Sequence, residues 1–201
     1  MKDDLHRFLR SRRSIRHFRT DPVPDKVIQH ILETAIYAPS AHNLQPWRFV
    51  IVTGEETKLH LAEALADKFR QDMVADGFPE MEIRASVGRT IRRARQAPVI
   101  IILCRDQITV NPQPDAVREQ VEMLMCTQSV ALAGLQLLLA AHAEGLGATW
   151  ICWPLFAPEE TVKALELDPK WEPQGMIFLG FPAETPERQT RRPVKDVTLY
   201  R

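Results

Sequence analysis

Pro98-Val99-Ile100-Ile101-Ile102-Leu103-Cys104 is the stretch of this sequence that decides the fold. The run is apolar throughout and is bounded by polar residues on both sides. Such a run is typical of a strand buried on both faces, because a strand with one wet face alternates apolar and polar residues. The sequence therefore predicts a sheet with side chains packed against each of its faces.

Helix-like and strand-like segments alternate on either side of this run. Apolar residues recur at helical spacing from Val27 to Ile36, after Pro24, which favours the first turn of a helix. Phe49 to Thr53 is a predicted strand. The other expected elements are helices over about 55–74, 80–96, 115–142 and 158–167 and strands over 147–153 and 176–181. Helices dominate, so the pattern predicts an α+β or α/β fold in three layers.

Composition narrows the class of protein. The 201 residues contain no repeat or low-complexity linker, so we expect one domain over residues 1–201, ending in an extended tail over 183–201. The formal net charge is zero, with 26 basic and 26 acidic residues, which disfavours a general nucleic-acid binder. Three separated cysteines without a CxxC pair fit a reduced cytoplasmic protein and argue against structural zinc.

No membrane or metal site is expected. The longest apolar region, 130–143, is interrupted by Gln136 and His142 and is too short to span a bilayer, so we interpret it as a buried helix. The charged N-terminus lacks the apolar core of a signal peptide. The six histidines show no metal-binding spacing.

Arg12-Arg13-Ser14-Ile15-Arg16 is a candidate phosphate site. It places three guanidinium groups and a hydroxyl within five residues. Planar guanidinium groups bind phosphate oxygens two at a time, and a serine adds a neutral donor. The alternative interpretation is a solvated basic turn.

The turn from Pro39 to Trp47 is a candidate site for a flat ring. The side-chain amides of Asn43 and Gln45 offer donors and acceptors that suit the pyrimidine edge of a flavin or a nucleobase. The alternative is a turn held by its own Asn and Gln side chains, with Trp47 as a core anchor.

Two further features have competing interpretations. Cys152 lies near a predicted strand end and could be a nucleophile, although buried cysteines are usually inert. The helix with Arg84, Arg89, Arg92 and further arginines is either a solvated, ion-paired helix or one wall of a groove for an anionic ligand.

The combination of these segments resembles the nitroreductase family of FMN-dependent oxidoreductases. In chain order the shared motifs are Arg12-Arg13-Ser14-x-Arg16, Ala38-Pro39-Ser40-x-x-Asn43-x-Gln45-Pro46-Trp47, Gly145-Leu146-Gly147-Ala148-Thr149-Trp150 and Arg191-Arg192-Pro193. The resemblance implies an α+β fold, a three-layer α/β/α sandwich, in a homodimer with FMN at the subunit interface. The long apolar helix over 115–142 would then be both a core and a dimer element.

The same resemblance implies roles for the basic residues. Arg12 and Ser14 would hold the FMN phosphate, with Arg13 on the same segment. Arg16 would point at the N1/O2 edge of the flavin ring, where a positive charge stabilises the reduced flavin. Arg191 would return from the tail to the phosphate, with Arg188 as the alternative.

Further site residues follow from the family pattern. Pro39, Ser40 and Ala41 would come from the partner subunit and touch the ring, in the same turn as Asn43. Cys152 and Trp153 would lie near the flavin N5 face.

The sequence resembles one subgroup more closely, the FMN-binding C-terminal domain of the coenzyme F420 biosynthesis protein FbiB. The shared segments are Asp67-Lys68-Phe69-Arg70-Gln71-Asp72, Asp76-Gly77-Phe78-Pro79, Pro154-Leu155-Phe156-Ala157-Pro158 and Trp171-Glu172-Pro173-Gln174. In that comparison Asp72 falls near the flavin.

The function implied is a cytoplasmic, homodimeric FMN oxidoreductase. NADH or NADPH would reduce FMN and leave, and a small-molecule acceptor such as a nitroaromatic, quinone or activated alkene would follow. No side-chain acid or base is required, and neither a nucleic acid nor a membrane is an expected partner. The alternatives are reduction of dehydro-F420-0, fragmentation of flavin to dimethylbenzimidazole, and a non-catalytic flavin- or nucleotide-binding protein.

Overall fold

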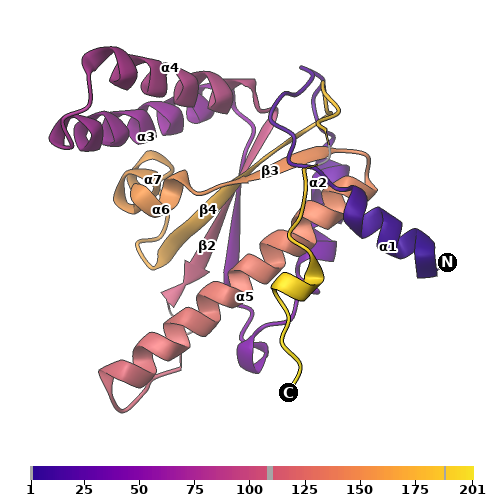
Figure 1. The fold of residues 1–201 in the computed structure, drawn as a ribbon. Helices are drawn as coiled ribbons and strands as arrows, with labels where there is room; N and C mark the ends of the chain where they lie inside the picture. Colours follow the sequence, from indigo (N-terminus) through magenta and orange to yellow (C-terminus); the bar gives the residue numbers. More distant parts are fainter. Residues whose placement is uncertain (1, 108–110, 188) are drawn as a thin grey trace.

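A four-stranded sheet lies at the centre of the molecule (Figure 1). The structure, a computed structural model, describes residues 2–107, 111–187 and 189–201. The strands are β1 (Trp47–Val52), β2 (Val99–Asp106), β3 (Gly147–Ile151) and β4 (Trp171–Gly180), in the order β1-β2-β4-β3. Every pairing between these strands is antiparallel, which confirms the α+β class and excludes a parallel α/β sheet for the described strands.

Strand β2 is buried along its whole length, as the apolar run predicted. Ile101 and Leu103 belong to one hydrophobic core, whereas Ile100 and Ile102 belong to a second core on the opposite face. The alternation follows from the period of two along a strand, which sends successive side chains to opposite faces. The sheet therefore separates two apolar layers.

Helices cover both faces of the sheet (Figure 1). On one side lie α2 (Asp25–Ala35) and the long α5 (Ala116–Ala143), whose apolar residues fill the first core. On the other side lie α3 (Glu55–Ala75), α4 (Glu80–Gln96), α6 (Trp153–Phe156) and α7 (Pro158–Ala164). This arrangement confirms the expected three layers.

Helix α5 is held against the sheet by a tryptophan that fits between two glycines. A Cβ atom at Gly134 of α5 would lie 2.2 Å from Cζ3 of Trp150, and one at Gly175 of β4 would lie 2.7 Å from its Cζ2. Both positions therefore need glycine to admit the indole. Among the described residues α5 alone is long and apolar enough to cross a membrane by length and composition, but it packs on all four strands as a core helix.

Some boundaries differ from those expected. Strand β3 ends at Ile151, and the predicted strand end at Cys152 and Trp153 instead starts α6, because Pro154 favours the first turn of a helix and lacks a ladder donor. Strand β4 begins at Trp171 rather than Met176. Its early part contains Pro173, which the sheet accommodates beside an irregularity in the pairing with β2.

The two ends of the chain add a helix and a tail. Helix α1 (Lys2–Ser11) was not predicted. Its apolar residues Leu5, Phe8 and Leu9 share one face, but none of them is buried, so α1 is not a core helix. The segment from Pro182 begins with an isolated bridge to Phe18 and contains the short turn η3 (Val194–Asp196) in its described part (Figure 1). The division of the chain into one domain and an extended tail stays a prediction.

Candidate phosphate and ring site

The arginine segment after α1 is fastened to the free edge of β3. Ser14 forms a parallel bridge with Ala148, and the amide of Ile15 donates to the carbonyl of Ala148 at 3.2 Å. Ile15 is buried, and a Cβ atom at Gly147 would lie 2.7 Å from its Cβ atom. One apolar residue therefore fixes the position of the basic residues on either side of it.

Arg12 is a half-buried guanidinium with an unsatisfied donor. Its Nη1 atom is buried and has no hydrogen-bond partner. Burial lowers the pKa of Arg12, and the neighbouring charges of Arg13 and Arg191 lower it further. A buried donor without an acceptor, among like charges, is costly unless an anion completes the group. This is the electrostatic pattern of an anion site.

A cavity of about 240 Å³ opens beside Arg12. Its lining includes Arg13 from the same segment, His142 from the end of α5, Gly147 from β3 and Glu184 from the tail. The structure thus brings Arg12, Arg13 and Arg191 into one neighbourhood, with Ser14 on the same short segment. Arg188 lies outside the described residues.

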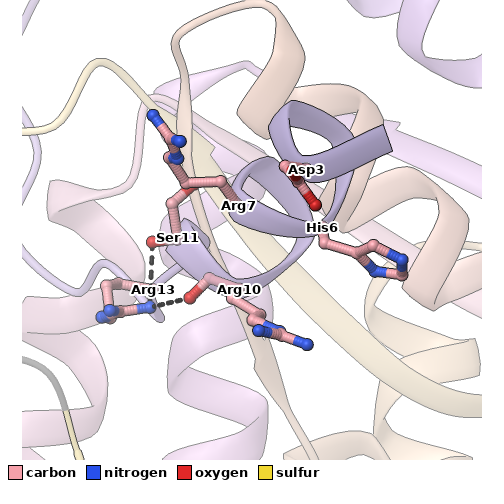
Figure 2. Close-up of a pocket in the computed structure, with 6 residues that line it drawn as sticks. All are labelled: Asp3, His6, Arg7, Arg10, Ser11 and Arg13. Carbon is pink, nitrogen blue, oxygen red and sulfur yellow. Dashed lines mark hydrogen bonds between the residues drawn. The ribbon is translucent and has the colours of Figure 1, made fainter. Parts of the chain in front are cut away.

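The guanidinium of Arg13 has a local role as well. Its Nη1 atom donates to the carbonyls of Arg10, Ser11 and Arg12 at 2.8, 2.9 and 2.8 Å, which caps the C-terminal end of α1. Figure 2 shows this group at the edge of a second cavity of about 460 Å³ on α1, where His6 and Arg7 point outward. The role of Arg13 toward a phosphate stays a prediction.

Arg16 and Arg191 are exposed, and among the described residues their guanidinium groups contact backbone carbonyls close to them in the sequence. Arg16 Nη1 contacts the Ser14 carbonyl at 3.5 Å, while its backbone amide donates to Glu184 Oε1 at 3.1 Å. Arg191 Nη1 donates to the Thr190 carbonyl at 3.1 Å. Both side chains are therefore available for an anion, or for the edge of a ring.

The turn that follows α2 has an unusual backbone. His42, Asn43 and Gln45 have φ values of 51°, 55° and 50°, in the left-handed region that residues other than glycine rarely adopt. The Gln45 side chain donates to Asn43 Oδ1 at 3.3 Å, and Trp47 is buried in the first core. The turn is thus held by its own amides, as the alternative interpretation expected. Strained backbone of this kind persists only where contacts over-determine it and is frequent at functional sites.

Two serines fix the start of this turn. The Ser40 hydroxyl accepts a hydrogen bond from the backbone amide of Gln45 at 3.1 Å. The backbone amide of Ala41 donates to the buried Ser129 hydroxyl of α5 at 3.2 Å. Pro39, just before them, is exposed. The turn is thereby bound to the middle of α5.

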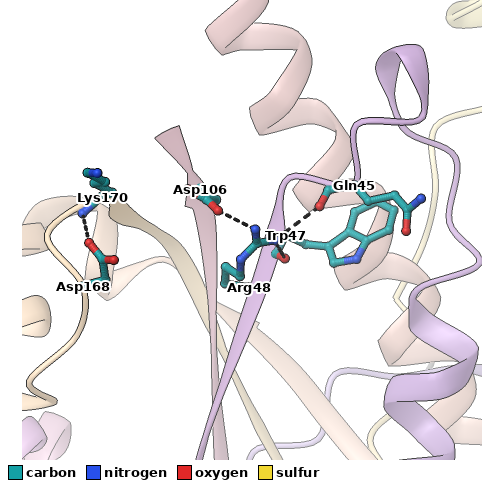
Figure 3. A network of polar contacts seen from close by, with 6 residues as sticks. All are labelled: Gln45, Trp47, Arg48, Asp106, Asp168 and Lys170. Atoms are coloured by element: carbon teal, nitrogen blue, oxygen red, sulfur yellow. Dashed lines mark hydrogen bonds and ion pairs between the residues drawn. The ribbon is translucent and has the colours of Figure 1, made fainter. Parts of the chain in front are cut away.

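An ion pair that the sequence analysis did not identify fixes the end of the turn (Figure 3). Arg48 on β1 pairs with the buried carboxylate of Asp106 on β2 and donates to the Trp47 carbonyl at 2.8 Å. The Asp106 amide donates to the Pro46 carbonyl at 2.8 Å. Asp106 comes two residues after the apolar run, beyond Arg105, and an acidic residue there was the available signal.

The arginine cluster and the turn lie far apart within one chain. The turn contacts α5 at Ser129, and the cavity beside Arg12 contacts it at His142. Ser129 and His142 are thirteen positions apart, which corresponds to about 20 Å at the rise of an α-helix. The structure therefore does not bring Pro39, Ser40, Ala41 and Asn43 to the arginines of the same chain.

Cys152 and Trp153 lie at the start of α6. Cys152 is exposed, and Trp153 packs edge-on against Phe69 of α3 and Phe178 of β4, with ring centroids 6.1 and 5.8 Å apart. Burial raises the pKa of the Cys104 thiol to about 12, which leaves that cysteine unreactive.

Asp72 lies on α3 three residues beyond Phe69. Its carboxylate binds Lys68 Nζ at 2.5 Å, and this hydrogen bond raises the pKa of Lys68. The recorded ring contact with α6 is made by Phe69, and the position of Asp72 relative to a flavin stays a prediction. The described residues contain no group of three or more His, Cys, Asp or Glu side chains suited to a metal.

Comparison with known proteins assigns the chain to a family. The profile of the nitroreductase family matches residues 9–181. The chain belongs to the nitroreductase family. This membership confirms the family expected from the motifs and the oxidoreductase class that it implies.

Relatives within the nitroreductase family span nearly the whole chain. The NADH dehydrogenase of Thermus thermophilus is 30% identical over 214 residues, covering 94% of this chain and 92% of its own. The provisionally named NAD(P)H nitroreductase YfhC of Bacillus subtilis is 31% identical, covering 96% and 91%. A provisionally named nitroreductase from Desulfovibrio desulfuricans, solved in complex with FMN, is 27% identical, with a TM-score of 0.75 and coverage of 98% and 96%.

Proposed function

We propose that this protein is an FMN-dependent oxidoreductase that passes hydride from NADH or NADPH to a nitroaromatic, a quinone or an activated alkene. The observation that carries the proposal is Arg12, a half-buried guanidinium with an unpartnered donor beside Arg13 and Arg191. A phosphate monoester supplies the negative charge and the acceptor oxygens that this group lacks. The FMN bound by the Desulfovibrio relative carries such a phosphate.

The residues present fit FMN beyond its phosphate. Ser14 would add a hydroxyl donor to the phosphate, and Arg16 would lie at the N1/O2 edge of the ring. Cys152 and Trp153 would lie at the N5 face, with Asp72 of α3 on the same side of the sheet. When bound, FMN supplies the hydride acceptance and donation that no side chain provides.

A homodimer would complete the ring site. Val117, Val121, Leu124 and Leu135 recur at helical spacing on the outer side of α5, and each is at least 50% exposed. A second copy covering this stripe would bury it and could bring its own Pro39, Ser40, Ala41 and Asn43 to the ring. We further propose one domain over residues 1–201 and a cytoplasmic location, in keeping with three unpaired cysteines.

An absorbance spectrum of the purified protein, followed by anaerobic addition of NADPH, tests the proposal. Flavin bands that bleach on addition are the expected result. A flavin that stays oxidised with both NADH and NADPH would indicate another donor or a binding protein. A protein that stays colourless after FMN is supplied would overturn the proposal.

Fragmentation of flavin is a second candidate function. The 5,6-dimethylbenzimidazole synthase of Rhodospirillum rubrum is 29% identical over 194 residues, covering 91% of this chain and 84% of its own. Incubation with free reduced FMN in oxygen distinguishes the two functions. A synthase would consume the yellow colour and release dimethylbenzimidazole, whereas the proposed oxidoreductase would return oxidised FMN.

Reduction of dehydro-F420-0 is favoured by a basic groove on α4. Arg92 and Arg95 line a cavity of about 530 Å³ together with Glu55. An anionic, phosphate-bearing substrate would complement these arginines. Turnover of dehydro-F420-0, compared with that of a simple quinone under the same conditions, decides between this function and general reduction.

A further inference from the structure

His142 lies where α1, α5 and the arginine cavity meet. Its ring stacks on Phe8 of α1 with centroids 4.9 Å apart, and its Nε2 atom lies 2.7 Å from the Ser11 hydroxyl oxygen. Because α1 has no buried residue, these contacts are a main attachment of α1 to the body of the protein. His142 also lines the cavity that contains Arg12.

The hydrogen bonds of Ser11 determine which ring nitrogen carries the proton. The hydroxyl of Ser11 donates its single hydrogen to the Phe8 carbonyl at 2.7 Å. The contact with His142 therefore requires Nε2–H as the donor and the Ser11 oxygen as the acceptor. Nδ1 is then the atom at which the ring gains a second proton.

The surroundings of His142 are basic. Burial lowers the pKa of His142, and the charges of Arg12 and Arg13 lower it further. Arg191 acts on Arg12 from the tail. These cations oppose protonation of the ring, so any anion that offsets them favours it.

The acids near the cavity have other partners. Glu184 lines the cavity, but one oxygen accepts the Arg16 amide at 3.1 Å and the other lies 3.8 Å from His17. Glu144, just after α5, binds Nδ1 of His30 on α2 at 2.9 Å. Within the described part of the chain, neither carboxylate therefore pairs with the guanidinium of Arg12.

We infer that the His142 ring takes up a proton when a phosphate monoester binds beside Arg12, and so becomes an additional cation of the phosphate site. The inference rests on the proposed function, since FMN is the phosphate monoester concerned. No bond other than N–H is made or broken: a proton moves from solvent to Nδ1, while Nε2–H keeps its bond to Ser11. His142 thereby couples cofactor affinity to pH.

The sign of the coupling follows from linkage. A group that binds a proton more tightly in the complex makes the complex more stable as the pH falls. The phosphate monoester has a second pKa of about 6, so it loses negative charge as the pH falls, and this weakens FMN binding. Protonation of His142 opposes this loss of FMN affinity. Its contribution is therefore measured as the difference in FMN affinity between wild type and a variant with a neutral side chain at position 142.

The test compares FMN binding by wild type and His142→Gln from pH 5.5 to 8, by flavin fluorescence and by calorimetry in buffers of different ionisation enthalpy. Glutamine stays neutral and retains an amide donor. We expect the variant to bind FMN about threefold to tenfold more weakly than wild type at pH 5.5, with the two converging at pH 8. Proton uptake on binding near pH 6 should fall in the variant by roughly 0.3–0.7 proton per site.

Controls separate charge from structure. His30→Gln, near the same end of α5 but in contact with Glu144, should match wild type at every pH. Ser11→Ala removes the acceptor of Nε2–H and should retain the proton uptake, although α1 is loosened. Riboflavin, which lacks the phosphate, should show no pH-dependent difference, and inorganic phosphate should compete with FMN more weakly against His142→Gln at low pH.

The outcomes are distinguishable. If neither protein binds FMN at any pH, the proposed function fails. If both bind FMN with the same pH profile and the same proton uptake, the oxidoreductase proposal stands and the role of His142 is wrong. A uniform loss of affinity at all pH values would also overturn the inference, because it would show a structural role alone.

Discussion

Replacing Arg12 by alanine should change cofactor binding and the stability of the flavin-free protein in opposite directions. The side chain is half-buried, with one buried donor unpartnered and two further arginines close by. A hydrogen bond to a charged group contributes about 1.5–3 kcal/mol, and loss of one corresponds to a decrease of roughly 10- to 150-fold in FMN affinity. Partial exposure of Arg12 places the expected loss toward the lower end of that range.

The same substitution should not destabilise the protein without FMN. Because the pKa of Arg12 is lowered by burial and by Arg13 and Arg191, its charged form is disfavoured in the folded chain. Removing it relieves repulsion and an unsatisfied donor, so we expect an equal or higher melting temperature of the flavin-free variant. An ordinary structural arginine would give the reverse.

The assay is the flavin content after purification, then FMN titration by fluorescence and thermal unfolding of the flavin-free protein. Arg84→Ala is a matched control, because Arg84 pairs with Glu80 on the exposed side of α4. This control should retain its flavin. Full retention of flavin by Arg12→Ala, or lower stability with unchanged affinity, would refute the phosphate assignment.

Three further substitutions or modifications probe the packing, the interface and the ring face. Gly134→Ala should destabilise the protein by about 1–3 kcal/mol in urea unfolding, since the new methyl overlaps the Trp150 ring; an unchanged midpoint would contradict that packing. If the proposed dimer forms through the exposed stripe on α5, Leu124→Glu should give monomers that lose FMN, measured by light scattering with the absorbance spectrum; a flavin-loaded dimer of the variant would exclude this stripe as the interface. Iodoacetamide at pH 8 should modify Cys152 and spare Cys104 until unfolding, and FMN should slow the modification; equal rates with and without FMN would place Cys152 away from the ring.

The regular elements could be predicted because their signals are local. The apolar run of β2 needed only its composition, and α4 begins and ends at the expected Glu80 and Gln96. The direction of the strands could not be predicted this way, since a strand covered on both faces looks the same in a parallel and an antiparallel sheet. Helix α1 escaped prediction because it is short and leaves its apolar residues largely exposed, and its contacts with His142 through Phe8 and Ser11 join residues far apart in the sequence.

The residue types of the candidate site are visible in the sequence, but the contacts that these residues make in three dimensions are not. Arginines spaced for a phosphate are visible in the sequence, yet the unpartnered donor of Arg12 depends on its three-dimensional surroundings. His142 is visible only as a polar interruption of an apolar helix, and the partner that explains it, Ser11, is 131 residues away. The pairing of Arg48 with Asp106 likewise joins two strands and has no local signal.

Three departures from ordinary folding rules have one common explanation in the proposed function. The chain keeps an unsatisfied buried guanidinium at Arg12, a turn with left-handed residues at His42, Asn43 and Gln45, and an exposed apolar stripe on α5. Each is unfavourable for an isolated chain, and natural proteins retain such features mainly at functional sites. In the proposed function a phosphate would complete the first and a second copy would cover the third. The second copy would also deliver its left-handed turn to the arginines, which lie about 20 Å from the turn of the same chain along α5. A monomeric protein without a cofactor would need three separate explanations, whereas a flavin held between two copies needs one.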